Sequence, residues 1–151
     1  MRAGIAHADA HGIDMLSMRS LAQDLGVVPM ALYKHVASKE ELLDEMLASV
    51  IAEIEPTPLV GDWRIDARQR MLAARRALLG HDWSQSVLES RAIMTPAMLG
   101  YLDSLVGALL GGGLSIDLTH HLMHALGNRM WGFNPKLFAA TPRSETESFN
   151  A

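Results

Sequence analysis

Apolar residues recur along most of this chain at the spacing of an α-helix. The clearest stripe runs through residues 42–54, where apolar side chains follow one another at steps of one and three: Leu42, Leu43, Met46, Leu47, Val50, Ile51 and Ile54. Such a stripe covers one side of a helix. No stretch alternates apolar and polar residues for long enough to indicate a β-strand. The pattern therefore predicts an all-α fold.

Residues that start and stop helices divide the chain into eight predicted segments. Ser17, Asp62, Thr95 and Ser115 are suited to N-cap helices, and Ser38 forms a capping box with the glutamate three residues later. Glycine and proline follow several of the apolar stretches and end them. We predict helices over residues 1–11 and 18–25, a short helix opening at Pro29, and helices from 39 to the prolines at 56 and 58, 63–79, 84–90, 96–110 and 116–133.

These helices fall into two predicted domains. Residues 1–46 hold three compact helices and the start of a fourth, and residues 47–151 form a bundle of longer helices. The fourth helix belongs to both parts, so we expect a rigid connection and not a flexible linker. The tail from Thr141 is polar and is expected to be loose.

Composition narrows the class of protein. Hydrophobic residues make up 49% of the chain and charged residues 20%, which is enough apolar material for a core. The chain has no cysteine, no signal region at its N-terminus and no apolar run of membrane-spanning length. We therefore expect a soluble cytoplasmic protein without a membrane partner. The net charge of −4 gives no general attraction to nucleic acid, so any such surface must be a local patch.

Residues 17–39 form such a patch. The apolar side chains around the turn at Gly26 are expected to pack on one another: Leu21, Ala22, Leu25, Val27, Leu32 and Val36. This packing leaves a row of mostly polar side chains outside, with one methionine and one alanine among them: Ser17, Arg19, Met30, Ala31, Tyr33, Lys34, His35 and Lys39. The segment contains three basic residues and one acid, Asp24. A solvated basic face on an ordinary helical hairpin is the alternative interpretation.

The run "LSMRSLAQDLGVVPMALYKHVASKEELLDEM" resembles the DNA-binding region of TetR-family transcriptional repressors, above all in the core "LAxxLGVxxxxLYxHVxxKxxLL". The resemblance is close over residues 12–47. It implies a homodimer that binds a double-stranded DNA operator through the third helix of each subunit, and a helical domain that binds a small-molecule inducer. The remaining two-thirds of the chain resembles that second domain only in its helical character and length.

The resemblance assigns a role to each position of the motif. Tyrosine, histidine and lysine side chains all donate hydrogen bonds to phosphate, and lysine also donates to guanine. The start of the second helix supplies Ser17, Met18 and Arg19. The residues facing the bases are Pro29, Met30, Ala31 and Lys34, and those holding the DNA backbone are Tyr33, His35 and Lys39.

Three features depart from the family pattern. Val28 occupies the position where the family usually has a serine or threonine that caps the third helix, and losing such a cap costs about 1 kcal/mol. The first helix begins almost at Met1, without a basic arm. The chain is also shorter than most members, so we interpret it as a truncated or compact member. The first two departures predict DNA binding that is weaker and more sensitive to salt than is usual in the family.

A polar stripe on the last predicted helix is a candidate wall of an inducer pocket. His121, His124, Asn128 and Trp131 follow at steps of three and four, so they share one face. Met94 and Leu102 are candidates to complete an apolar lining, although core packing explains them equally well. The alternative for the stripe is exposure to solvent or a place in the dimer interface.

Other functions are less well supported. His120 and His124 are one helical turn apart and could share a metal ion, but no third ligand has a matching spacing, so we predict no metal and no other cofactor. An enzyme, such as a metal-dependent helical-bundle oxidase, is disfavoured because the chain has no Glu-x-x-His motif, nucleophile elbow or phosphate loop. A dimerising protein that has lost DNA binding remains the main alternative.

Overall fold

The structure is a computed structural model that describes residues 1–54, 60–90 and 95–130. Within these ranges the regular elements are all helical, which confirms the predicted all-α class. They are α1 (Arg2–His11), the short 3₁₀ helix η1 (Ile13–Met15), α2 (Met18–Asp24), α3 (Pro29–Leu32), α4 (Lys39–Ala52), α5 (Trp63–Leu79), α6 (Ser84–Ser90), α7 (Pro96–Gly111) and α8 (Ile116–Met130).

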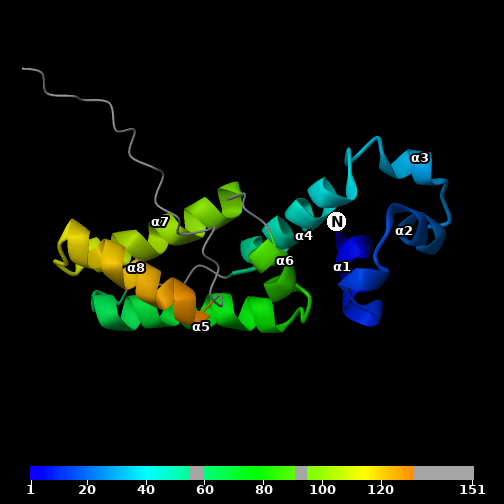
Figure 1. The fold of residues 1–151 in the computed structure, drawn as a ribbon. Coiled ribbons are helices and arrows are strands. Elements are labelled where there is room, and N and C mark those ends of the chain that lie inside the picture. Colours follow the sequence, from blue (N-terminus) through cyan, green and yellow to red (C-terminus); the bar gives the residue numbers. More distant parts are fainter. Residues whose placement is uncertain (55–59, 91–94, 131–151) are drawn as a thin grey trace, which may run out of the picture.

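The helices are arranged along an elongated molecule (Figure 1). Helices α1, α2 and α3 lie at one end, and α5, α7 and α8 lie together at the other. Helix α4 runs between the two ends and packs against α1, α5, α6 and α7. The fourth helix therefore contacts helices at both ends of the molecule.

Side-chain caps start most of these helices at the predicted residues. Ser38 Oγ accepts a hydrogen bond from the amide of Glu41 at 3.1 Å, and Asp62 Oδ1 accepts from the amide of Arg64 at 2.8 Å. The Glu41 carboxylate accepts from the amide of Ala37, and not from that of Ser38 as the expected capping box required. The reciprocal box forms instead at α2, where Ser17 and Ser20 each accept from the backbone amide of the other.

One continuous core joins the two ends of the molecule. Met46 and Val50 of α4 are completely buried, and the same cluster extends from Ile5 in α1 to Leu109 in α7. Helix α1 approaches α4 closely at Gly4, where a Cβ atom would lie 2.9 Å from the sulfur of Met46. Because interiors are packed as densely as organic crystals, this small residue sets how closely the two helices approach.

Two residues expected in the core are exposed. Leu25 and Val27, which flank the turn between α2 and α3, have exposed fractions of 47% and 43%. The packing beneath the turn is supplied by Leu21, Ala22 and Val36, which are all buried. Since α3 is only one turn long, the chain around Gly26 lies on the outside of this small core.

No helix in residues 1–54, 60–90 and 95–130 is both long enough and apolar enough to cross a membrane.

Candidate nucleic-acid interface

A tight turn places α3 at the outer end of the molecule. Gly26 follows α2 with a φ of +65°, a left-handed conformation that glycine adopts without steric cost. The amide of Val27 returns to the carbonyl of Ala22 at 2.9 Å and closes the turn. Leu32 packs against the core, so α3 is held on its inner side while its outer side stays free of contacts with the core.

The side chains that follow the turn are exposed, as the sequence predicted. Tyr33 has an exposed fraction of 46%, and Lys34 and His35 are also exposed. The three residues lie in the turn immediately after α3 and not within the helix itself, which ends at Leu32. A phenol, an ammonium group and an imidazole therefore project from one short segment, and each is a hydrogen-bond donor to phosphate.

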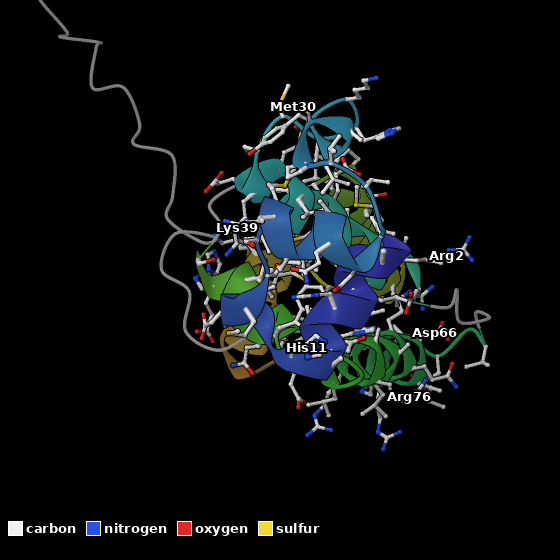
Figure 2. The ribbon with its side chains drawn as sticks, turned by 90° about the vertical axis from the view of Figure 1, so that its right-hand side faces the viewer. Arg2, His11, Met30, Lys39, Asp66 and Arg76 are labelled. Atoms are coloured by element: carbon white, nitrogen blue, oxygen red, sulfur yellow. The ribbon has the colours of Figure 1, made fainter. Side chains whose placement is uncertain are left out.

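The residues expected to face the bases lie on the same protruding element. Met30 has an exposed fraction of 70% and lies at the outer end of the unit in Figure 2. Pro29 is exposed at the first position of α3, while Ala31 is half-buried. Lys39, the first residue of α4, is half-buried and lies nearer the body of the molecule (Figure 2).

The start of α2 presents only part of the expected contact set. Arg19 is exposed. Met18 is buried, with an exposed fraction of 8%, so its side chain belongs to the core and only its backbone N–H remains for a phosphate. Ser17 is exposed, but its hydroxyl already accepts from the Ser20 amide at 3.0 Å as the cap of α2.

The one acid of this segment is paired with a histidine that sequence reasoning missed. Asp24 Oδ2 lies 2.5 Å from Nδ1 of His7, and His7 is buried in α1. The other ring nitrogen of His7 lies 3.4 Å from the carbonyl oxygen of Met15. The contact ties α1 to the end of α2 and engages the one carboxylate of residues 17–39. No motif in the sequence indicated this pair.

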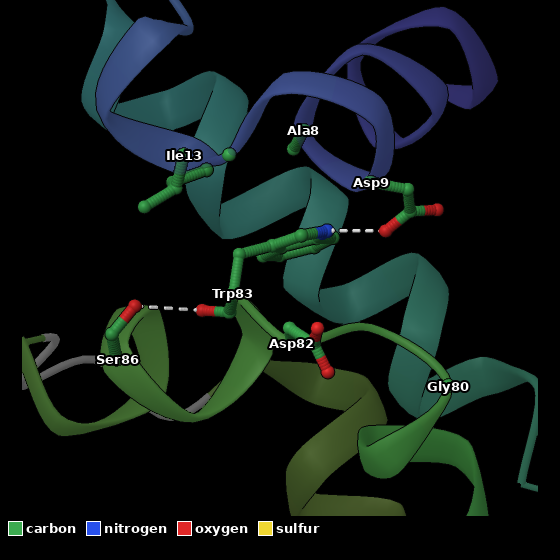
Figure 3. Close-up of a pocket in the computed structure, with 8 residues that line it drawn as sticks. Ala8, Asp9, Ile13, Gly80, Asp82, Trp83 and Ser86 are labelled. Carbon is green, nitrogen blue, oxygen red and sulfur yellow. Dashed lines mark hydrogen bonds between the residues drawn. The ribbon is translucent and has the colours of Figure 1, made fainter.

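A second unpredicted contact joins the helix-turn-helix unit to the remaining helices. Asp9 Oδ1, at the end of α1, accepts a hydrogen bond from Trp83 Nε1 at 2.7 Å (Figure 3) and another from His81 Nδ1 at 2.8 Å. Trp83 is buried, and its ring faces a cavity of about 400 Å³ between α1 and the α5–α6 turn. We call Asp9, His81 and Trp83 the interdomain cluster.

An apolar groove of about 320 Å³ lies among α5, α7 and α8. Its lining is almost entirely hydrocarbon, with two arginines contributing from α5: Trp63, Arg64, Ala67, Arg68, Met71, Leu72, Leu109, Leu122 and Leu126. The guanidinium of Arg64 lies 4.4 Å from the ring centre of Trp63, within the range of a cation–π contact. The groove has the size of a small-ligand site.

Of the predicted polar stripe of α8, the two described side chains, His121 and His124, do not line this groove. His121 is exposed and His124 is half-buried, whereas Leu122 and Leu126 of the same helix face the groove. Leu102 is half-buried and packs against the core. This placement agrees with the alternative interpretation of the stripe, solvent exposure or an interface. Met94, Trp131 and the side chain of Asn128 lie outside the described residues.

This arrangement defines the class of the protein as an all-α helix-turn-helix protein with a second helical part. The family described as "Bacterial regulatory proteins, tetR family" matches residues 1–46. The transcriptional repressor DrrR1 of Streptomyces coeruleorubidus is 35% identical over 121 residues, which are 76% of this chain and 43% of DrrR1. The chain spans about half the length of the curated relatives it matches.

Solved structures show the same fold. ActR of Streptomyces coelicolor, in complex with actinorhodin, has a TM-score of 0.76 and 30% identity, over 86% of this chain and 63% of ActR. BioQ, in complex with its double-stranded DNA operator, has a TM-score of 0.77 and 26% identity, over 91% of this chain and 84% of BioQ. Residues 1–46 therefore match the TetR family, and the chain as a whole is similar in fold to TetR-family regulators. Its relatives are transcriptional regulators, which are not a class of enzymes.

Proposed function

We propose that this protein is a transcriptional repressor that binds an operator in double-stranded DNA and leaves it when a small molecule binds. The observation that carries the proposal is the exposed row Tyr33, Lys34 and His35 directly after α3, on a helix-turn-helix unit of the TetR family. The relatives support the same function, since they include a named repressor and a structure with an operator.

In this proposal residues 1–46 are the DNA-binding domain. Helix α3 enters the major groove, where Met30 and Ala31 reach thymine methyl groups and Lys34 donates to guanine. Tyr33, His35 and Lys39 donate to phosphates, with Arg19 and the backbone at Met18 and Ser17 at the start of α2. Two subunits place their α3 helices about 34 Å apart on a palindromic operator. We therefore propose a homodimer acting in the cytoplasm, where bacterial DNA is located.

Residues 47–151 are, in this proposal, the ligand-binding and dimerisation domain. The apolar groove among α5, α7 and α8 supplies a surface for an apolar ligand. A ligand shifts the protein away from its DNA-binding state only if it binds another arrangement of the helices more tightly. A change of helix arrangement at the groove would reach α3 through helix α4 and the interdomain cluster. Both contact helices of the two proposed domains.

The proposal is tested by fluorescence anisotropy of labelled duplex DNA from the region flanking the gene of this protein. We expect binding of that DNA at least about 1,000-fold tighter than of a scrambled duplex of the same length, the lower end of specific recognition. Equal binding of both duplexes would contradict an operator. A dimer in size-exclusion chromatography that binds neither duplex in low salt would support a dimerising protein without DNA binding instead.

A further inference from the structure

Helix α8 carries a pair of histidines whose ring nitrogens nearly converge. His120 Nε2 lies 3.1 Å from His124 Nε2, and the two ring planes cross at 71° with their centres 4.4 Å apart. Residues four apart in a helix lie one above the other on the same face. The pair therefore directs two nitrogen atoms at nearly the same point beside the helix.

This separation matches the distance between two nitrogens bound to one metal ion. A metal–nitrogen bond of about 2.05 Å puts two imidazole nitrogens about 2.9 Å apart at a 90° angle and about 3.3 Å apart in a tetrahedron. The observed 3.1 Å lies between these limits. We propose that His120 and His124 form a binding site for a late first-row divalent metal ion, of the class Cu²⁺, Ni²⁺ or Zn²⁺.

Another histidine pair with the same spacing shows that spacing alone does not make such a site. His7 and His11 are also four residues apart in a helix, with ring centres 4.9 Å apart. Nδ1 of His7 is held by Asp24 and its Nε2 faces the carbonyl of Met15. Both nitrogens of His7 are therefore engaged, whereas in α8 the two Nε2 atoms face each other. Sequence spacing led us to expect no metal at His120 and His124, and the side-chain geometry changes that expectation.

The exposure of the two histidines and the number of protein ligands determine how a metal ion reaches the site and which ions bind there. His120 is exposed and His124 is half-buried, so an ion reaches the pair from solvent. Among the described residues no group of three histidine, cysteine, aspartate or glutamate side chains is placed to hold a metal. Water completes the coordination in the free chain. A two-imidazole site prefers Cu²⁺ and then Ni²⁺ or Zn²⁺, and it discriminates against the oxygen-seeking ions Mg²⁺ and Ca²⁺.

Binding of a metal ion at this site needs no reactant besides the ion itself. In the free pair one imidazole donates its Nε2 proton to the other. When a metal binds, both Nε2 atoms donate their electron pairs to the ion, and each ring carries its proton on Nδ1. This site is independent of the proposed DNA binding, because no residue of the helix-turn-helix unit takes part.

The test is isothermal titration of the full chain, without a histidine tag, with Ni²⁺ and with Zn²⁺. We expect one ion per chain, and roughly 100-fold weaker binding in His120→Ala and in His124→Ala, since each loses the second intramolecular ligand. His121→Ala is the matched control: it removes a neighbouring exposed histidine and should bind as the wild type does. Circular dichroism checks that the variants keep their helices.

Three results would overturn the proposal. They are no Ni²⁺ or Zn²⁺ binding by the wild type at millimolar concentrations, unchanged binding in a folded His120→Ala variant, or an equal loss in His121→Ala. Because His120 is exposed, its replacement keeps the test decisive even if His124→Ala fails to fold. A metal-dependent rise of the melting temperature, present in the wild type and absent in His120→Ala, is a second readout.

Discussion

Asp9 and Trp83, 74 residues apart in the sequence, meet through a hydrogen bond of 2.7 Å from the indole N–H to the carboxylate. Trp83 is buried, with an exposed fraction of 4%, so its N–H is largely shielded from solvent and depends on this carboxylate for a partner. The pair joins α1 of the helix-turn-helix unit to the segment between α5 and α6. Its position makes it a structural link between the helix-turn-helix unit and the remaining helices.

Replacing Asp9 by alanine should lower the free energy of unfolding by about 2 kcal/mol, because a buried donor without a partner costs about 1–3 kcal/mol. Urea denaturation followed by circular dichroism measures the change. Asp82→Ala is the control, since Asp82 is an exposed neighbour and should alter the stability by less than about 0.5 kcal/mol. Equal effects of the two substitutions would rule out a specific role for the Asp9–Trp83 contact.

Replacing Tyr33 by phenylalanine together with Lys39 by alanine should weaken binding to every DNA sequence to a similar extent. Both side chains are assigned to phosphates, and the loss of one lysine–phosphate contact should reduce the slope of affinity against salt by about 1. Fluorescence anisotropy at several salt concentrations measures both effects.

The matched control for this DNA-binding prediction is Arg76→Ala. Arg76 is an exposed cation of α5 that lies on the opposite side of the molecule from Met30 in Figure 2, so removing its charge should leave affinity almost unchanged. An unchanged affinity in the double variant would reject the assignment of Tyr33 and Lys39 as DNA contacts.

Replacing Val28 by serine should stabilise the start of α3. Val28 occupies the N-cap with the extended backbone typical of that position, and its side chain makes no cap hydrogen bond. A serine hydroxyl there can accept from an amide of the first turn, which is worth about 1 kcal/mol and about 2–4 °C in melting temperature. Thermal unfolding compares Val28→Ser with Val28→Ala, which loses the same exposed apolar surface without adding a cap. No difference between the two variants would show that the cap does not form.

Burial in the core raises the pKa of Tyr101 well above its ordinary value, although the charge of Arg70 opposes the shift. Because the folded chain holds this proton more tightly than the unfolded chain, the associated stability is fully present below about pH 10, the unfolded pKa. It decreases as the pH rises above that value. Tyr101→Phe should remove this part of the alkaline loss of stability.

The absorbance of tyrosinate separates the two tyrosines of the chain. Replacing Tyr33 by phenylalanine leaves Tyr101 as the one tyrosine of the chain, so the absorbance then reports on Tyr101 alone. The Tyr33→Phe variant should then show no tyrosinate before unfolding. Ionisation near pH 10 in that variant, with native circular dichroism, would contradict the burial of Tyr101.

The features that sequence predicted well depend on neighbouring residues. The cap at Ser38 requires only the amide of Glu41 three residues later. The exposure of Tyr33 follows from the tight turn at Gly26 and from the burial of Ala22 before the turn and Val36 after it. In each case the interacting groups lie within a few residues of one another, so the contact between them can be predicted from their spacing in the sequence.

The amino-acid sequence by itself determined the helices and the turn at Gly26, because these depend on local hydrogen bonds and on the period of the apolar residues. Tertiary structure decided the exposure of Leu25, the burial of Met18, the contact of Asp9 with Trp83 and the approach of His120 to His124. Contacts between distant residues depend on how whole helices pack, and the separation of two side chains on one helix depends on their rotamers. Residue spacing along the chain specifies neither.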